Sequence, residues 1–352
     1  MTNASLWMKS EGPEADIVLS SRVRLARNLT DLPFPNRLGD SDGKRLAARL
    51  QEAFDGLGND WQLTYHPLAD IPPIERQVLV EKHVVSPALI QEPVRFEGLV
   101  ADPGESISIM VNEEDHLRMQ VFLAGLQLSQ AWQMANRLDD DLERNLNFAY
   151  DSELGYLTAC PTNVGTGLRA SVMVHLPALV LTRQVQPLFH ALAQIGVVVR
   201  GLYGEGTEVV GNLFQVSNQV SLGLTEEEFV HNLTVVAQEI VGRERQARQI
   251  LTQSHRLEVA DRVGRAWGIL THASIISSDE ALKLLSEVKL GQDLEFIKVP
   301  GHTTFSELAL MTRPGYLMYR AGQELHSMER DALRATILRE RLISDAEYKE
   351  EH

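Results

Sequence analysis

The sequence has only one cysteine, no secretion signal and no apolar run long enough to cross a membrane. The single cysteine, Cys160, excludes a disulfide framework and fits a reducing compartment. Residues 1–16 contain neither the basic stretch nor the apolar core of a signal peptide. The longest apolar runs are interrupted by His175, Pro177 or Arg200. We therefore expect a cytoplasmic protein that is not inserted in a membrane.

Basic residues and the common nucleotide-binding motifs are also scarce. Lys and Arg number 33 against 48 Asp and Glu, which gives a formal net charge of −15. This acidity argues against general nucleic-acid binding. There is no Gly-x-x-x-x-Gly-Lys-Ser/Thr loop, no His-Arg-Asp and no Asp-Phe-Gly. A nucleotide site would have to be built from other residues.

Three consecutive acids, Glu113, Glu114 and Asp115, stand between two strand-like segments. The first segment covers residues 106–111, and in the second Arg118 and Gln120 alternate with apolar residues. Like charges at a hairpin tip raise the pKa of a carboxyl group, which suits a group that must accept a proton. The segment therefore indicates a binding or catalytic site.

A turn rich in Pro, Asn and Gly follows Cys160 and leads into a predicted strand over residues 168–176. Arg169, Ser171 and Met173 share one face of this strand. A lone cysteine is often a buried structural thiol, so that alternative stays open beside a role in chemistry.

Five arginines stand on the polar faces of strand-like segments. The opposite faces are apolar, so an antiparallel sheet would gather the guanidinium groups on one surface. Such a cluster needs a polyanion, and the planar arginine fork matches the phosphates of a nucleoside triphosphate. The alternative is that each is a solvated strand residue. The five are Arg22, Arg24, Arg118, Arg169 and Arg200.

Together these segments resemble the phosphagen (guanidino) kinases. Residues 112–118 match the family signature Asn-Glu-Glu-Asp-His-Leu-Arg, and residues 160–166 match Cys-Pro-Thr-Asn-x-Gly-Thr. Residues 20–24 resemble the family's Ser-x-Arg-Val-Arg strand, and segments 199–208 and 216–218 follow in the family's order. The resemblance spans residues 17–254 and implies an α+β fold with an antiparallel β-sheet flanked by helices.

The resemblance also implies roles for individual residues. Glu114 would be the catalytic base, Glu113 would meet the water shell of a Mg²⁺ ion bound through ATP, and no protein ligand would bind the metal directly. Glu205 would hold the side of the acceptor guanidino group opposite Glu114. Cys160 would lie beside the same group as a thiolate. The ATP site would contain the five arginines with Ser20, Ser21 and His83, although a lone histidine is often structural. Met173 departs from the family, because small-molecule enzymes often have an adenine-contacting histidine there.

The acceptor implied is an arginine side chain in a protein. Small-molecule phosphagen kinases carry a helical domain before the Ser-x-Arg-Val-Arg strand, whereas here only residues 1–16 precede Ile17. The chain also continues beyond the catalytic region, and both features resemble the bacterial protein-arginine kinases of the McsB type. That resemblance implies marking of substrates for a Clp-type protease in a stress response, and a zinc-finger activator. The alternatives are a phosphagen kinase for free arginine and a non-catalytic phosphoarginine-binding module.

The C-terminal part is helical in pattern, so we expect domains at residues 1–254 and 255–352. The pattern predicts helices over 256–271, over 279–290 with Gly291 as the cap, over 306–311 and over 324–342. Upstream, Thr225 and Glu228 form a capping box for a long helix. Apolar faces in the C-terminal part would bury themselves against a second copy, which predicts a homodimer, with a compact monomer as the alternative.

One motif in the C-terminal part suggests regulation. Arg330 and Arg334 share a helix face with Asp331 beside them. Two guanidinium groups and one carboxylate complement phosphoarginine, and Arg-Asp-x-x-Arg-Ala resembles the phosphoarginine-recognition motif of protein-arginine kinases. The alternative is a salt-bridged surface helix.

Overall fold

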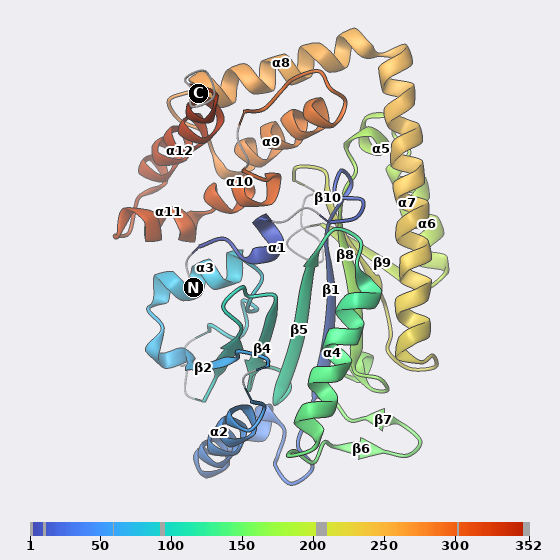
Figure 1. Ribbon diagram of the computed structural model, residues 1–352, viewed down its shortest axis with the longest axis vertical. Coiled ribbons are helices and arrows are strands. Elements are labelled where there is room, and N and C mark those ends of the chain that lie inside the picture. The colour runs from blue at the N-terminus through green and yellow to red at the C-terminus, as the bar shows by residue number, and fades with distance from the viewer. Residues whose placement is uncertain are drawn as a thin grey trace.

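An eight-stranded β-sheet lies at the centre of the computed structural model, which describes residues 3–9, 12–58, 60–91, 96–201, 210–300 and 303–347. All neighbouring strands in it are antiparallel, in the order β2-β3-β4-β5-β1-β8-β10-β9 (Figure 1). The strands are β1 Val18–Arg27, β2 Thr64–Pro67, β3 Gly98–Ala101, β4 Ile107–Val111, β5 Leu117–Ala124, β8 Leu168–His175, β9 Val197–Gly201 and β10 Leu213–Asn218. The antiparallel sheet expected from the sequence is confirmed.

Side-chain alternation gives the sheet two different faces. In β1, Val23 is fully buried, whereas Arg22 and Arg24 on either side of it are partly buried. The neighbouring strands β5 and β8 place Gln120 and Arg169 opposite Arg24. Because successive side chains of a strand point to opposite faces, one face is apolar and the other carries the polar residues.

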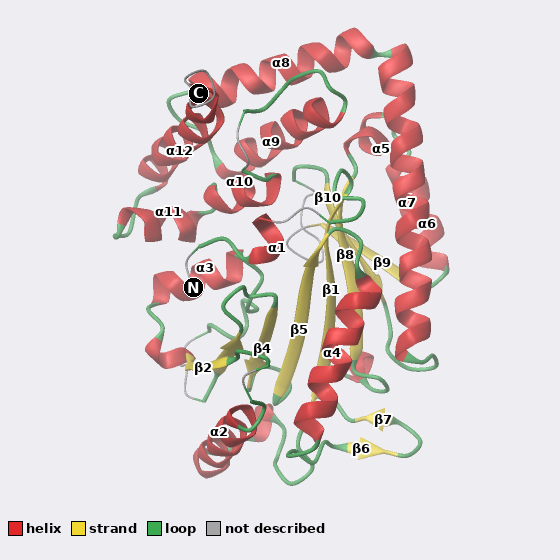
Figure 2. Ribbon diagram, in the orientation of Figure 1, coloured by secondary structure: helices red, strands yellow, loops and turns green. Residues whose placement is uncertain are grey.

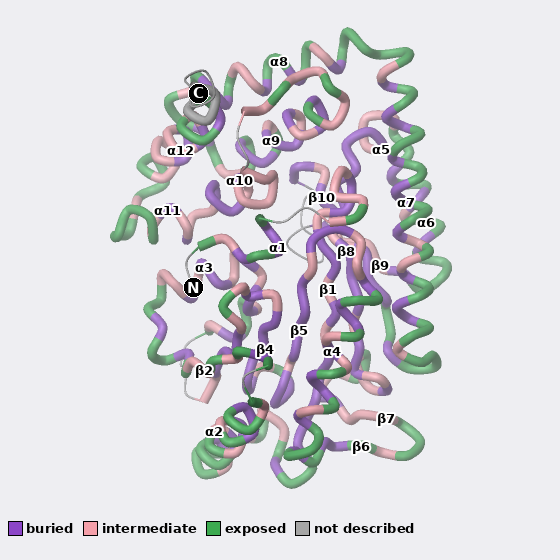
Figure 3. Tube along the Cα trace, viewed as in Figure 1, coloured by how far each residue is buried: buried purple, intermediate pink, exposed green. Residues whose placement is uncertain are grey.

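Two long helices cover the apolar face, as Figure 2 shows. Helix α4 (Leu128–Glu143) packs on β1 and β5, and α7 (Glu226–Ser254) packs on β8 and β10. The capping box predicted for α7 is confirmed, since the Thr225 hydroxyl accepts from the Glu228 N–H and the Glu228 carboxylate accepts from the Thr225 N–H. The strands and the inner sides of these helices are the most buried part of the molecule (Figure 3).

Further elements surround the sheet. The two-stranded sheet β6–β7 lies at one end of the molecule (Figure 1). The elements are α1 Leu6–Lys9, η1 Pro35–Arg37, α2 Asp40–Asp55, η2 Leu68–Asp70, α3 Pro73–Glu81, β6 Tyr150–Asp151, β7 Gly155–Tyr156, η3 Pro161–Asn163, α5 Pro177–Leu181 and α6 Val185–Gln194.

The C-terminal helices form a core of their own, to which Leu270, Leu285 and Leu338 contribute fully buried side chains. The helices are α8 Arg256–His272, α9 Ser278–Asp293, α10 Phe305–Met311, α11 Pro314–Ala321 and α12 Ser327–Glu347. Most of the apolar faces from which a homodimer was predicted are therefore covered within one chain, and that argument no longer supports a dimer.

Two details of the C-terminal part differ from the sequence expectation. The predicted helix end at Gly291 is wrong, because α9 continues to Asp293. A Cβ atom at position 291 would lie 2.3 Å from Cγ1 of Val263, so the glycine allows α8 and α9 to approach closely. Helix α11, which begins with Pro314 at its first position, was not predicted.

The C-terminal helices reach the polar side of the sheet. Helix α10 contacts α1, and α11 packs against α3. At the second contact the Glu81 carboxylate accepts hydrogen bonds from the N–H groups of Gly315 (2.7 Å) and Tyr316 (2.8 Å). The first turn of α11 is thereby attached to the end of α3. No helix in the described part of the chain is long and apolar enough to cross a lipid bilayer.

Candidate active site

Four of the five predicted arginines lie on adjacent strands of the polar face. Arg24 is opposite Arg169 across β1 and β8, and Arg118 is opposite Ala26 across β5 and β1. Burial, followed by the charges of Arg118 and Arg169, lowers the pKa of Arg22 to about 9. Burial and the charges of Arg22, Arg118 and Arg169 also hold the pKa of Arg24 well below its ordinary value. Guanidinium groups that depress one another's pKa values form a surface prepared for an anion. We call these four residues, Arg22, Arg24, Arg118 and Arg169, the arginine surface.

Neutral side chains orient part of this surface. Arg22 donates to Oε1 of Gln215 (3.1 Å) and to the Ser171 hydroxyl (3.4 Å). Arg169 donates to the Ser217 hydroxyl (3.3 Å). Nε of Arg24 is buried and has no hydrogen-bond partner among the described residues. The positive charge of Arg22 is held in place without being cancelled by these bonds.

The other residues predicted for the ATP site do not all lie at one place. Arg200 lies on the edge strand β9, opposite Gln215 of β10. Ser20 and His83 line a cavity beside Arg22. The hydroxyl of Ser21 instead donates to the carbonyl of Gly125 and accepts from the N–H of Gln127, so the structure does not bring Ser21 to that cavity.

The three consecutive acids have three different environments. Glu113 accepts from Arg118 (2.7 Å) and from the Ser86 hydroxyl (2.5 Å). Burial alone would raise the pKa of Glu113, but Arg118 and Ser86 hold it below its ordinary value. Asp115 is buried and accepts from the Asn28 amide (2.6 Å) and the Ala159 N–H (2.7 Å).

Glu114 is the remaining acid, and it is exposed. Among the described residues, no hydrogen bond or ion pair holds its carboxylate. Partial burial and the charge of Asp115, opposed by Arg118 and reinforced by Glu113, raise the pKa of Glu114. A carboxylate with a raised pKa and no protein partner among the described residues therefore stands beside the arginine surface.

Asp115 also connects the acidic tip to the cysteine turn, a role that the sequence did not reveal. Its carboxylate accepts a hydrogen bond from the N–H of Ala159, the residue before Cys160. The Cys160 thiol is partly buried and lies 3.1 Å from the Thr162 hydroxyl. The acidic signature is thus bonded to the residue that immediately precedes the second signature. The remaining predicted catalytic residue, Glu205, lies outside the described residues.

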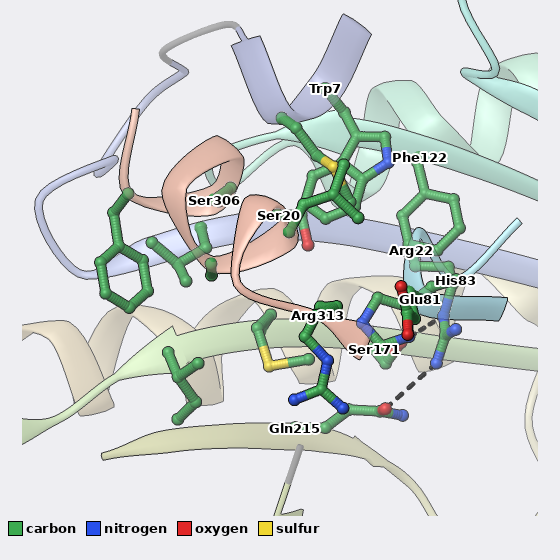
Figure 4. A pocket seen from close by; sticks show the side chains of 17 residues that line it. Trp7, Ser20, Arg22, Glu81, His83, Phe122, Ser171, Gln215, Ser306 and Arg313 are labelled. Atoms are coloured by element: carbon green, nitrogen blue, oxygen red, sulfur yellow. Dashed lines mark hydrogen bonds between the residues drawn. The ribbon is translucent and has the colours of Figure 1, made fainter. Parts of the chain in front are cut away.

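Two cavities open along the polar face of the sheet. The first is largely apolar, with Trp7, Phe122 and Phe305 among its walls, and Figure 4 shows its side chains. The second contains Arg24 and Arg118 together with Ser86. Burial and the charges of Arg22 and Arg313 lower the pKa of His83 to about 3, so its ring is neutral. Sequence reasoning missed Trp7, Ser86 and Gln215, which belong to no recognisable motif.

The predicted regulatory motif is on α12. Arg334 is buried and donates to the carbonyls of Thr312 (2.7 Å) and Ile276 (2.7 Å) and to the Asp331 carboxylate (2.5 Å). Arg330 is only partly buried and donates to the carbonyl of Leu325 (2.6 Å). Arg334 and Asp331 are brought together, but the Arg334 guanidinium is largely committed to backbone groups.

A direct metal site is not evident in the described part of the chain, where no group of three or more His, Cys, Asp or Glu side chains is placed to hold an ion. Glu113, the buried carboxylate nearest the arginine surface, is already held by Arg118 and Ser86.

Comparison with known proteins agrees with this geometry. Residues 45–247 match the profile of the ATP:guanido phosphotransferase C-terminal catalytic domain, and residues 256–352 match that of the protein-arginine kinase McsB C-terminal domain. The chain is also similar in structure to lombricine kinase, with a TM-score of 0.59 and 25% identity over 69% of this chain and 71% of that one. The duplicated taurocyamine kinase of Schistosoma mansoni gives a TM-score of 0.61 at 25% identity, over 74% of this chain and 39% of that one.

Three bacterial relatives, each named protein-arginine kinase, match almost the whole chain. The relative from Symbiobacterium thermophilum is 54% identical over 96% of both chains, and that from Moorella thermoacetica is 50% identical over 96% of this chain and 97% of its own. The relative from Halothermothrix orenii is 51% identical over 97% of both chains. The catalytic signatures, the guanidino-kinase fold and these relatives together show that the chain belongs to the protein-arginine kinases of the ATP:guanido phosphotransferase family.

Proposed function

We propose that the chain transfers the γ-phosphoryl group of ATP to the guanidino group of arginine side chains in proteins. The observation that carries this proposal is the position of Glu114. Glu114 is an exposed carboxylate with a raised pKa and no protein partner among the described residues. The residue before it, Glu113, forms an ion pair with Arg118 of the arginine surface. The cationic guanidinium of the acceptor would lie at Glu114, and the anionic phosphates of ATP would lie on the adjacent arginine surface.

The reaction follows from the charges on each side. A guanidinium is protonated at neutral pH and is a poor nucleophile until a proton is removed. Glu114 would take that proton as the guanidino nitrogen forms its bond to the γ-phosphorus and the bond to the β-phosphate bridging oxygen breaks, leaving ADP. The arginine surface would neutralise the negative charge spread over the transferred group, an effect that can reach about a thousandfold for one arginine.

The remaining predicted site residues complete the proposal. Arg200 and Ser20 would extend the nucleotide site, and His83 would contribute a neutral ring. Cys160 would lie beside the acceptor, with Glu205 on its other side. Mg²⁺ bound through ATP would neutralise phosphate charge, and Glu113, already paired with Arg118, would face its water shell.

The test of the base is the substitution Glu114→Gln, which keeps the size of the side chain and removes its proton affinity. We expect phosphoarginine formation on a basic protein to fall by at least about a hundredfold. Mass spectrometry under non-acidic conditions would measure it. Glu153→Gln, at the exposed tip of the β6–β7 hairpin, is the matched control and should retain the parental rate. Transfer at the parental rate by the Glu114→Gln variant would remove Glu114 as the base.

The same assay distinguishes the acceptor. Acid-labile phosphate on the protein supports protein-arginine kinase activity, and phosphate only on free arginine supports a small-molecule phosphagen kinase. Nucleotide binding without transfer to either acceptor would indicate a binding module.

Regulation by phosphoarginine at Arg330, Asp331 and Arg334 is a separate part of the proposal. Its support is that Arg330 and Asp331 remain partly exposed on α12. The buried Arg334 donates a hydrogen bond to the Asp331 carboxylate and so orients it. The variant Arg330→Ala should weaken phosphoarginine binding in calorimetry without unfolding the protein. Unchanged affinity would exclude Arg330 from such a site.

The assembly and the cellular role are further parts of the proposal. We propose domains at 1–254 and 255–352 and a homodimer through the C-terminal part, where Leu257 and Met328 remain 83% and 74% exposed. Light scattering at low concentration would decide between dimer and monomer. A cytoplasmic stress-response role, a zinc-finger activator and product recognition by a Clp-type protease complete the proposal. Stability of a phosphorylated substrate in cells with and without the protease would test it.

A further inference from the structure

The two cavities on the polar face share one group of residues. Arg22, Glu81, His83, Gln215 and Arg313 line both the apolar cavity and the cavity that contains Arg24 and Arg118. These shared residues therefore form the junction between an apolar compartment and a cationic one. A nucleotide has the same division, since its base is largely apolar and its phosphates are anionic.

One residue of this junction comes from the C-terminal helices. Arg313 is the N-cap of α11, and α10 supplies Phe305, Ser306 and Leu310 to the apolar cavity. In Figure 4, Arg313 extends from the C-terminal segment toward the strands, and Gln215 lies near its guanidinium in this view. C-terminal residues that lie outside the 45–247 match to the catalytic family profile therefore line part of the apolar cavity.

The charge at the junction favours an anion. Arg22 and Arg313 line both cavities together with His83, and their charges help to lower the pKa of its ring. The acid at the junction, Glu81, has its two oxygens engaged by the N–H groups of Gly315 and Tyr316. The carboxylate of Glu81 is therefore occupied by the start of α11, and Arg313 donates to the Ser278 hydroxyl (3.5 Å).

We propose that Arg313 contacts the phosphate nearest the nucleoside, so that the C-terminal helices complete the ATP site. This inference rests on the proposed kinase function and adds a residue to its nucleotide site. With the base in the apolar cavity and the terminal phosphates over Arg24 and Arg118, the α-phosphate lies at the junction. Arginine suits this position because its fork donates to phosphate oxygens at fixed geometry.

The test compares ligands that differ by one phosphate. Calorimetry would measure the affinity of adenosine, AMP, ADP and ATP for the full chain and for Arg313→Met. We expect AMP, ADP and ATP to weaken by a similar factor of about ten, as for the loss of a charge-assisted hydrogen bond, and adenosine to bind unchanged. Arg313→Lys, which keeps the charge, should recover part of the loss.

Two further variants locate the contact. Arg320→Met, on the exposed side of the same helix, should bind all four ligands as the parent does. Arg118→Met, from the second cavity only, should weaken ATP and leave AMP unchanged. Unchanged AMP affinity in Arg313→Met, or an equal loss for adenosine, would overturn the inference. Because binding is measured without transfer, failure of phosphoarginine formation in the parent chain would instead count against the proposed function.

Discussion

The arginine surface on the sheet and the Arg334 site on α12 contain the same side chain in opposite circumstances. Arg24 lies among three other guanidinium groups, and its buried Nε has no partner among the described residues. Arg334 is more completely buried, and its donors reach two backbone carbonyls and one carboxylate. The first arrangement leaves positive charge available to a ligand, whereas the second uses it to hold the protein together.

The difference shows that anion binding depends on what surrounds an arginine more than on the motif that contains it. Burial of a charge is costly unless partners compensate it. On the sheet an incoming polyanion would supply the compensation, so the site is incomplete without its ligand. On α12 the protein's own carbonyl and carboxylate groups compensate most of the charge of Arg334.

Replacing Arg24 should have the largest effect on activity. Arg24→Met removes one charge of the arginine surface, and we expect the phosphoryl-transfer rate to fall by about a thousandfold. The free energy of unfolding should stay constant or rise at neutral pH, because the fold depresses the pKa of Arg24 and so disfavours its charged form. Kinetic assays and urea unfolding would measure both quantities. Arg45→Met, on an exposed surface of α2, is the control that should change neither.

Arg334 should show the reverse pattern. Arg334→Met leaves the carbonyls of Thr312 and Ile276 and the Asp331 carboxylate without their donor, and we expect the free energy of unfolding to fall by about 3 kcal/mol. Urea unfolding of Arg334→Met beside Arg330→Met would isolate this effect, since Arg330 gives up a single bond, to the carbonyl of Leu325. A stable Arg334→Met variant that loses only phosphoarginine binding would mean that Arg334 is chiefly a ligand contact.

Sequence patterns predicted those parts of the molecule that depend on local alternation. The strands carrying Arg22, Arg118 and Arg169 follow from period-two alternation, and the start of α7 follows from its capping box. Ser21 was misplaced because it neighbours the signature arginine but points to the other face of β1. The regulatory motif was read from spacing, which could not show that Arg334 is directed inward.

Tertiary contacts account for most of the rest. Gly291 resembles a helix cap in sequence, yet the reason for it is the approach of Val263 from α8. Arg313 carries no local signal apart from the proline that follows it, and its place at the cavity depends on Glu81 binding the start of α11. Contacts between segments far apart in the chain cannot be read from either segment alone.

The pH dependence of activity at low pH gives a smaller test of how surroundings change a charged side chain. Glu113 and Glu114 are adjacent acids whose pKa values are shifted in opposite directions. Arg118 and Ser86 overcome the effect of burial and lower the pKa of Glu113, whereas burial and Asp115 raise that of Glu114. A base must be deprotonated, so kcat/KM should fall tenfold per pH unit as the pH drops through the raised pKa of Glu114. The midpoint should lie above the ordinary glutamate pKa of about 4.3. In the residual activity of Glu114→Gln this limb should disappear, while persistence at the same midpoint would assign it to another group.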